Sequence, residues 1–289
     1  MGSGGRAGKL CFPPPGGASI ARQLDGLQQN THIYCALLDL PTRAEGMAAG
    51  ESKMHMGAAC ADIWSIDRFG KPVISLIRGI VDWTEFAFAV NGTHKVADLD
   101  ATFTVRAACR GVLPGLGASF TLPALPGRLG HYLALTGLPI DAPLAYRVGW
   151  LTHRVPASEF PAIIAALSRA EPVDALLDGL DAGPVASRLD QNLQDIERCF
   201  SAASAGEIIA RLEAIPGANA AWGVATAAAM RAVRPDVMEA VFSALTSGTQ
   251  PSLRLGLLED FRVANREPGS RGEEDQALML PVPKPPSIS

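Results

Sequence analysis

Cysteine and histidine are both scarce in this sequence, and neither residue type forms a cluster. The five cysteines lie far apart and include no C-x-x-C pair. This pattern excludes a zinc knuckle and a disulfide framework, and it is typical of a reducing compartment. The five histidines form neither an H-x-x-x-H nor an H-E-x-x-H motif. The sequence therefore predicts no metal site.

A strong net charge and long hydrophobic runs are also lacking. The 25 Lys and Arg and 29 Asp and Glu residues give a net charge of −4 without a basic cluster, which argues against nucleic acid as a partner. The longest nearly uncharged stretch, Val112 to Ala124, contains Pro and Gly and is too short to span a bilayer. The first residues, MGSGGRAGKLCFPPPGG, have no apolar core of a secretory signal peptide. We expect a soluble protein without a membrane partner, located in the cytoplasm, or in the mitochondrial matrix if the source is eukaryotic.

Apolar residues are abundant enough for a large core. The 289 residues are 48% hydrophobic and 19% charged, which suits one large domain, alone or with a smaller appendage. We expect a disordered arm at residues 1–17, an α/β core at 18–170, a linker at 171–188, a helical region at 189–266 and a loose tail at 267–289.

Strand and helix patterns alternate over the first half of the chain. Continuous apolar runs and short alternating segments predict strands at His32–Leu40, Lys71–Val81, His94–Val96 and Ala101–Val105. Helical periodicity lies between and after them, at Ser19–Gln29, Ala58–Phe69 and most of the chain beyond Leu189. The pattern is typical of repeated ββα units followed by a helical C-terminal region.

Several segments resemble one protein family. Phe69–Val81, which reads FGKPVISLIRGIV, resembles the strand before the catalytic helix of the crotonase (enoyl-CoA hydratase/isomerase) superfamily. Leu122–Gly137, Gly149–Pro156 and Ile196–Ser201 with Glu207–Glu213 are similar to the 3-hydroxyisobutyryl-CoA hydrolases. The resemblance covers about residues 32–266. It implies a crotonase-like α/β spiral of ββα units that binds an acyl-CoA ester, with CoA as part of the substrate and no other cofactor.

The resemblance also implies an oxyanion hole made of two backbone N–H groups that would stabilise the thioester oxygen. The first loop of the family corresponds to Ala49, Gly50 and Glu51, where Glu51 replaces a small residue. The second loop, G-G-G in the family, reads Trp83-Thr84-Glu85 here, so the donor position falls on Thr84. Asp82 or Thr84 would otherwise simply cap a helix.

The acidic residues that the family uses for nucleophile and proton chemistry are missing. The resemblance places Ala107 and Gly115 at the positions of the catalytic carboxylates, and Ala59 at a third. None of these residues can carry a proton, so the inherited mechanism cannot run through them. Glu51, Glu85 and Cys109 are the candidate replacements.

Four further residues have weaker assignments, and three functions stay open. Arg106 and Arg110 either contact CoA phosphates or lie on a solvated loop, whereas His131 and His153 are most simply structural. The chain is an active acyl-CoA hydrolase, a homologue that binds CoA esters without turnover, or a partner that stabilises an active relative, as a homo- or hetero-oligomer. We expect a hydrolase-type protein with little or no activity, and whether it is an enzyme stays open.

Overall fold

The strands form two sheets that lie next to each other. The computed structural model describes residues 6–12, 19–40, 53–246 and 250–265. The larger sheet is parallel throughout, with the order β1 (Arg6–Leu10), β2 (Ile33–Asp39), β3 (Val73–Ile77), β5 (His94–Ala97) and β8 (His153–Arg154). In the smaller sheet, β6 (Thr102–Thr104) pairs in parallel with β4 (Ile80–Asp82) and antiparallel with β7 (Ile140–Asp141).

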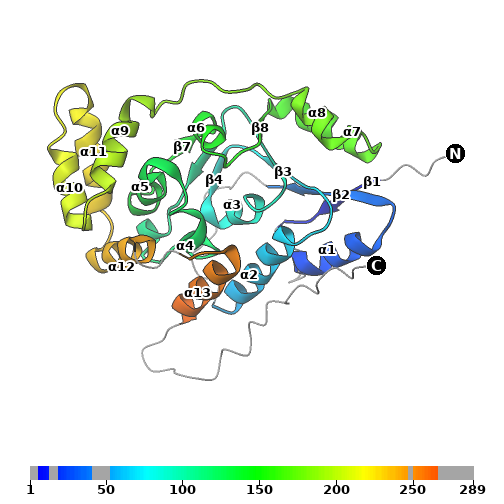
Figure 1. Cartoon of the computed structure of the whole chain (residues 1–289), viewed down its shortest axis with the longest axis horizontal. Coiled ribbons are helices and arrows are strands. Elements are labelled where there is room, and N and C mark those ends of the chain that lie inside the picture. Colours follow the sequence, from blue (N-terminus) through cyan, green and yellow to red (C-terminus); the bar gives the residue numbers. More distant parts are fainter. Residues whose placement is uncertain (1–5, 13–18, 41–52, 247–249, 266–289) are drawn as a thin grey trace.

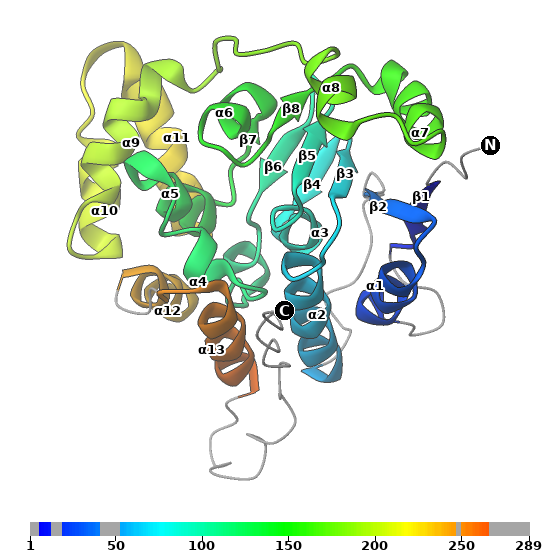
Figure 2. The ribbon, with the colours of Figure 1, turned by 45° about the vertical axis from the view of Figure 1, so that its right-hand side comes forward.

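Helices cover both faces of the larger sheet (Figures 1 and 2). On one face, α7 (Phe160–Ser168) and α8 (Val173–Asp178) bury apolar side chains against β2, β3 and β5. On the other face lie α1 (Ile20–Gln29), α2 (Lys53–Asp67) and α3 (Trp83–Ala89), which share the main core. Continuous apolar runs such as Val73–Ile77 are expected of strands that are buried on both faces.

The second half of the chain is largely helical, as the sequence predicts. Besides α7 and α8, the helices from residue 118 onward in the described ranges are α4 (Ala118–Thr121), α5 (Leu129–Thr136), α6 (Ala142–Arg147), α9 (Leu193–Phe200), α10 (Ala205–Glu213), α11 (Ala220–Arg231), α12 (Pro235–Thr246) and α13 (Leu253–Asn265). Figure 1 shows that α13 returns to lie beside α2 and α4. None of the helices in the described ranges is both long and apolar enough to cross a membrane.

One predicted strand is divided in the structure. The prediction of a single strand at Lys71–Val81 is wrong, because β3 ends at Ile77 and β4 begins at Ile80 in the other sheet. Gly79 lies between them with a φ of 65°. This left-handed conformation costs glycine little, and it lets the chain turn from one sheet to the other. The turn brings Asp82 and Trp83 to the start of α3.

Two segments that were expected to lack regular structure contain elements. The predicted arm at residues 1–17 is wrong for Arg6–Leu10, since β1 extends the parallel sheet and buries Leu10. The predicted linker at residues 171–188 contains α8, which begins after Pro172 and buries Val173 and Leu177 one turn apart. Both elements are short, so each presents only two buried positions to a periodicity search. The predicted tail at residues 267–289 lies outside the described residues.

Candidate functional site

The start of α3, where the resemblance places the second oxyanion loop, is capped by the chain's own carboxylate. Asp82 is 2% exposed, and its Oδ1 accepts the N–H of Trp83 at 2.9 Å. The same oxygen accepts the N–H of Arg106 at 3.0 Å and lies 3.4 Å from the donating hydroxyl of Thr104. The guanidinium of Arg110 forms an ion pair with this carboxylate. Asp82 therefore ties the helix start to the 104–110 segment, and it is a helix cap as one of the two sequence interpretations proposed.

Trp83 fills the space between this helix and the next loop. The residue is 3% exposed, and its indole Nε1 donates to the carbonyl of Gly115 at 2.6 Å. Its ring packs against those of Phe86 and Trp150, with centroid distances of 6.5 and 6.2 Å. The Trp83 side chain thus connects the start of α3 with Gly115, the position at which the resemblance would place the second carboxylate.

The other residues predicted for the oxyanion loops are placed as follows. Thr84 is exposed, and its hydroxyl donates to Glu85 Oε2 at 2.9 Å. Glu85 lies in the first turn of α3, where its negative charge interacts favourably with the helix dipole. Ala49, Gly50 and Glu51 lie outside the described residues.

The environment of Cys109 does not favour a nucleophilic thiolate. The Sγ atom donates to the carbonyl of Thr136 at 3.7 Å. Burial raises the pKa of this thiol, and the nearby Arg106 only partly opposes that effect. An activated cysteine needs the opposite shift. Neighbouring Ala107 precedes the short 3₁₀ turn Ala108–Arg110 as its N-terminal cap residue and brings no ionisable group to it.

Asp260 is a buried acid beside the candidate site that the sequence analysis missed. Asp260, in α13, is 8% exposed, and its Oδ2 accepts the N–H of Gly117 at 2.8 Å. A Cβ atom added to Gly115 would lie 4.0 Å from the Asp260 Cβ and 3.1 Å from Met56 Cε. Burial raises the pKa of Asp260 to about 6 in spite of the hydrogen bonds that it accepts from α4. A signal was present, since Asp260 continues the apolar face that includes Leu253 and Leu257.

Ala59, at the third carboxylate position, lies in α2 and packs against the main core. The adjacent Cys60 is fully buried and its thiol donates to the carbonyl of Leu257 in α13, at 3.7 Å. Burial raises the pKa of this thiol to about 12, with a further contribution from Asp260. Ala59 and Cys60 of α2 therefore contribute to core packing and have no group suited to proton transfer near neutral pH.

His131 and His153, the two histidines within the segments of family resemblance, lie in different parts of the fold. His131 lies in α5 and is buried, which lowers its pKa to about 4 and keeps the ring neutral. His153 in β8 lies under α8, with its Nε2 at 3.1 Å from Asp178 Oδ1 and its ring stacked on His94 at 6.0 Å. Within the described ranges, no group of three His, Cys, Asp or Glu side chains could hold a metal ion.

Several curated proteins align with most of this chain. A probable 3-hydroxyisobutyryl-CoA hydrolase 3 of Arabidopsis thaliana is 26% identical over 250 residues, 82% of this chain and 66% of the relative. The 3-hydroxyisobutyryl-CoA hydrolase 1 of the same plant is 30% identical over 203 residues, which cover 68% of this chain and 54% of the relative. A mitochondrial 3-hydroxyisobutyryl-CoA hydrolase of Dictyostelium discoideum is 28% identical over 230 residues, 74% of this chain and 60% of the relative. The chain thus spans between about half and two thirds of the length of these relatives.

Solved structures confirm the crotonase-like fold that the sequence predicts. A carnitinyl-CoA dehydratase from Mycobacterium thermoresistibile superposes with a TM-score of 0.77 at 22% identity, over 91% of this chain and 83% of that one. An enoyl-CoA hydratase from Rhodobacter sphaeroides gives a TM-score of 0.72 at 23% identity, over 85% and 75% of the two chains. The model of the enoyl-CoA hydratase/isomerase family matches residues 26–270, and this chain therefore belongs to that family.

Proposed function

We propose that this protein binds acyl-CoA esters as a member of the 3-hydroxyisobutyryl-CoA hydrolase branch and has little or no hydrolase activity. The similarity to curated hydrolases of that name supports the ligand class. The word "mitochondrial" in the name of the Dictyostelium relative supports a mitochondrial location if the source is eukaryotic. The capped start of α3 carries the proposal of low activity, because the buried carboxylate that caps it, Asp82, is already held by two backbone N–H groups and Arg110.

Thioester hydrolysis needs a group that activates water or attacks the carbonyl, and a donor for the leaving thiolate. Asp82 accepts two backbone N–H groups and pairs with Arg110, so this carboxylate holds the local fold together. Asp260, the other buried acid near the site, holds the N–H of Gly117. Ala107 and Gly115 offer no substitute.

Oxyanion stabilisation is also opposed at this position. The transition state of acyl transfer carries negative charge on the former carbonyl oxygen, and N–H groups aimed at that oxygen lower the barrier. Here the donor position falls on Thr84, and the carboxylate of Asp82 lies two residues before it, where it accepts the N–H of Trp83. A second negative charge at about 4 Å would cost roughly 1 kcal/mol in water and more in a buried site.

The purified protein is expected to release no thiol from 3-hydroxyisobutyryl-CoA above a heat-inactivated blank. Ordinary enzymes turn over at about 1 per second or faster, so a thiol-reactive dye detects them readily. Calorimetric titration of the same protein with the same ester is expected to show saturable binding. Turnover near the ordinary enzyme rate would contradict the proposal, and absence of binding would contradict its ligand class.

Adding the two acids with and without the removal of Trp83 distinguishes two causes of low activity, namely a missing carboxylate and a blocked site. Ala107→Glu with Gly115→Asp restores both acids of the family pattern. With Trp83→Gly in addition, the same variant also removes the indole that bonds to Gly115. We expect hydrolysis to appear, at least tenfold above the blank, in the triple variant and not in Trp83→Gly alone, because the single change supplies no acid.

A further inference from the structure

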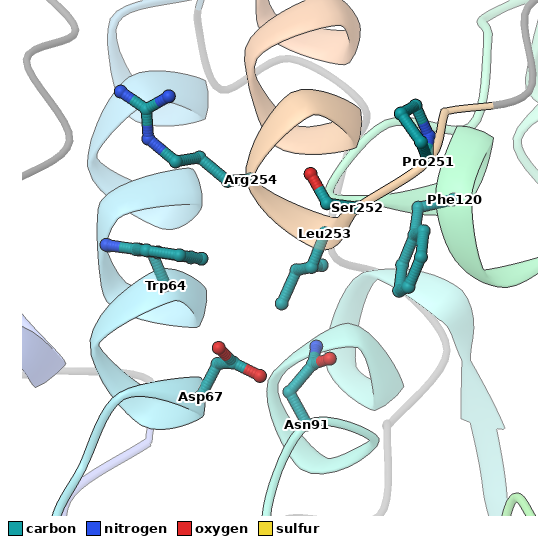
Figure 3. Close-up of a pocket in the computed structure, with 8 residues that line it drawn as sticks. All are labelled: Trp64, Asp67, Asn91, Phe120, Pro251, Ser252, Leu253 and Arg254. Carbon is teal, nitrogen blue, oxygen red and sulfur yellow. The ribbon is translucent and has the colours of Figure 1, made fainter. Parts of the chain in front are cut away.

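A cavity lies at the opposite end of α3 from the candidate site (Figure 3). Its volume is about 630 Å³, within the range of small-molecule sites. Figure 3 shows residues from α2, α4, α13 and the segment after α3 around it, among them Trp64, Asn91 and Phe120. Asn91 follows α3, whereas Thr84 is at its start, seven residues or about 10 Å along the helix axis. The cavity is therefore separate from the start of α3, where the resemblance places the second oxyanion loop.

The middle of the cavity is aromatic and apolar. Trp64 of α2 and Phe120 of α4 supply ring surface, and Leu253 of α13 lies between them in Figure 3. The guanidinium carbon of Arg68 lies 5.8 Å from the centroid of the Trp64 ring, so a cation already helps to orient this indole. Aromatic rings in a ligand pack well against such walls, in stacked or edge-to-face geometry.

The two ends of the cavity carry opposite charges. Arg254 lies on one side of Trp64 and Asp67 on the other, next to Asn91 (Figure 3). Asn91 donates through Nδ2 to the carbonyl of Ala87 at 3.0 Å, which turns its side chain into the structure and fixes it. Within the described ranges, neither Arg254 nor Asp67 forms an ion pair or a side-chain hydrogen bond. Burial raises the pKa of Asp67, with Arg68 opposing the shift, as expected of a carboxylate that is partly withdrawn from water without a close partner.

We propose that this cavity binds a small aromatic molecule with a carboxylate at one end and an amine at the other. Arg254 would bind the carboxylate, since a guanidinium matches its two oxygens. Asp67 and the amide oxygen of Asn91 would accept from the ammonium group, and the ring would pack between Trp64 and Phe120. An amino acid in its usual form does not fit this division of charges, because its ammonium and carboxylate groups share one carbon.

The probe for this site is 4-(aminomethyl)benzoate, together with benzoate and benzylamine, which each carry one of its ends. Binding is measured by ligand-observed NMR titration of the full-length protein. Arg254→Ala is expected to weaken the binding of 4-(aminomethyl)benzoate and of benzoate about tenfold or more, because each of these probes loses a hydrogen bond between charged groups. Asp67→Asn is expected to weaken the binding of 4-(aminomethyl)benzoate and of benzylamine for the same reason. Neither substitution should change the binding of the half-probe that lacks its partner group.

Arg262→Ala is the matched control for Arg254, since it removes a guanidinium from the same helix, at a position paired with Glu259. It is expected to leave the affinity of all three probes unchanged. The proposal is overturned if no probe binds saturably at millimolar concentration, or if Arg254→Ala and Arg262→Ala weaken binding equally. It is also overturned if each half-probe responds to both substitutions. Circular dichroism of every variant shows whether the fold is intact, and the acyl-CoA titration is a separate readout that does not depend on this cavity.

Discussion

Gly130→Ala is expected to destabilise the protein by about 3 kcal/mol or more, a cost at the upper end for overpacked sites. A Cβ atom at this position would lie 1.9 Å from the carbonyl oxygen of Leu122 and 2.4 Å from its carbon. These are backbone atoms of the segment that ends α4, so relief requires the first turn of α5 to move away from α4. Because cores are close-packed, such a movement also disturbs the neighbours of α5.

Gly26→Ala is the matched control, because it adds the same methyl group inside α1 where nothing lies within 4 Å. It is expected to stabilise the protein by about 0.5–1 kcal/mol through helix propensity. Thermal unfolding followed by far-UV circular dichroism should separate the two variants by on the order of 10 °C. A Gly130→Ala protein within 1 kcal/mol of the wild type would show that α5 can shift without loss of packing.

Gly130 also illustrates why the fold could be predicted from the sequence. It belongs to Leu122–Gly137, one of the segments that resemble the hydrolases, and in the structure this segment is where α4 and α5 approach closely. Segments of this kind record backbone contacts of the fold, and they predicted the crotonase-like architecture correctly. These segments include none of the positions of the family's catalytic carboxylates, which is why the same resemblance did not decide whether the protein is active.

The departures from the family pattern were visible in the sequence, but their consequences depend on contacts across the fold. Trp83 in place of a glycine predicts added bulk, whereas the bond from its indole to Gly115 depends on a partner 32 residues away. The pairing of Arg110 with Asp82 depends in the same way on β4 and β6 being neighbours. Sequence patterns reveal elements through the regular spacing of residue types. A contact between two residues that are distant in the chain leaves no such regular spacing, so it cannot be predicted in this way.

Asp260 was the least predictable residue, since it reaches the site from a helix more than 140 residues later in the chain. A charged residue on the apolar face of a helix indicates a buried partner, because an unpaired buried charge is costly. The identity of that partner, the start of α4, follows only from the way α13 packs against α2 and α4.

Asp260→Asn is expected to change the pH dependence of stability more than any other single substitution near the site. Burial raises the pKa of this carboxyl from 3.8 to about 6, so the folded state binds its proton more tightly than the unfolded state. The contribution of Asp260 to stability is therefore greatest below pH 4 and is lost as the pH rises through 6. At 1.36 kcal/mol per pKa unit, the loss amounts to about 3 kcal/mol. Asparagine does not titrate in this range, and its Oδ1 can still accept the N–H of Gly117.

The measurement is the difference in unfolding free energy between wild type and Asp260→Asn, from urea titrations at several pH values between 4 and 8. Groups common to both proteins cancel in this difference, including His131, whose lowered pKa makes stability fall as the pH drops from about 6.5 towards 4. The wild type should lose about 3 kcal/mol relative to the variant over the range. A flat difference for Asp260→Asn would mean that the hydrogen bonds from α4 fully compensate the burial of this carboxylate, and that α13 is held in place equally well at acid and neutral pH.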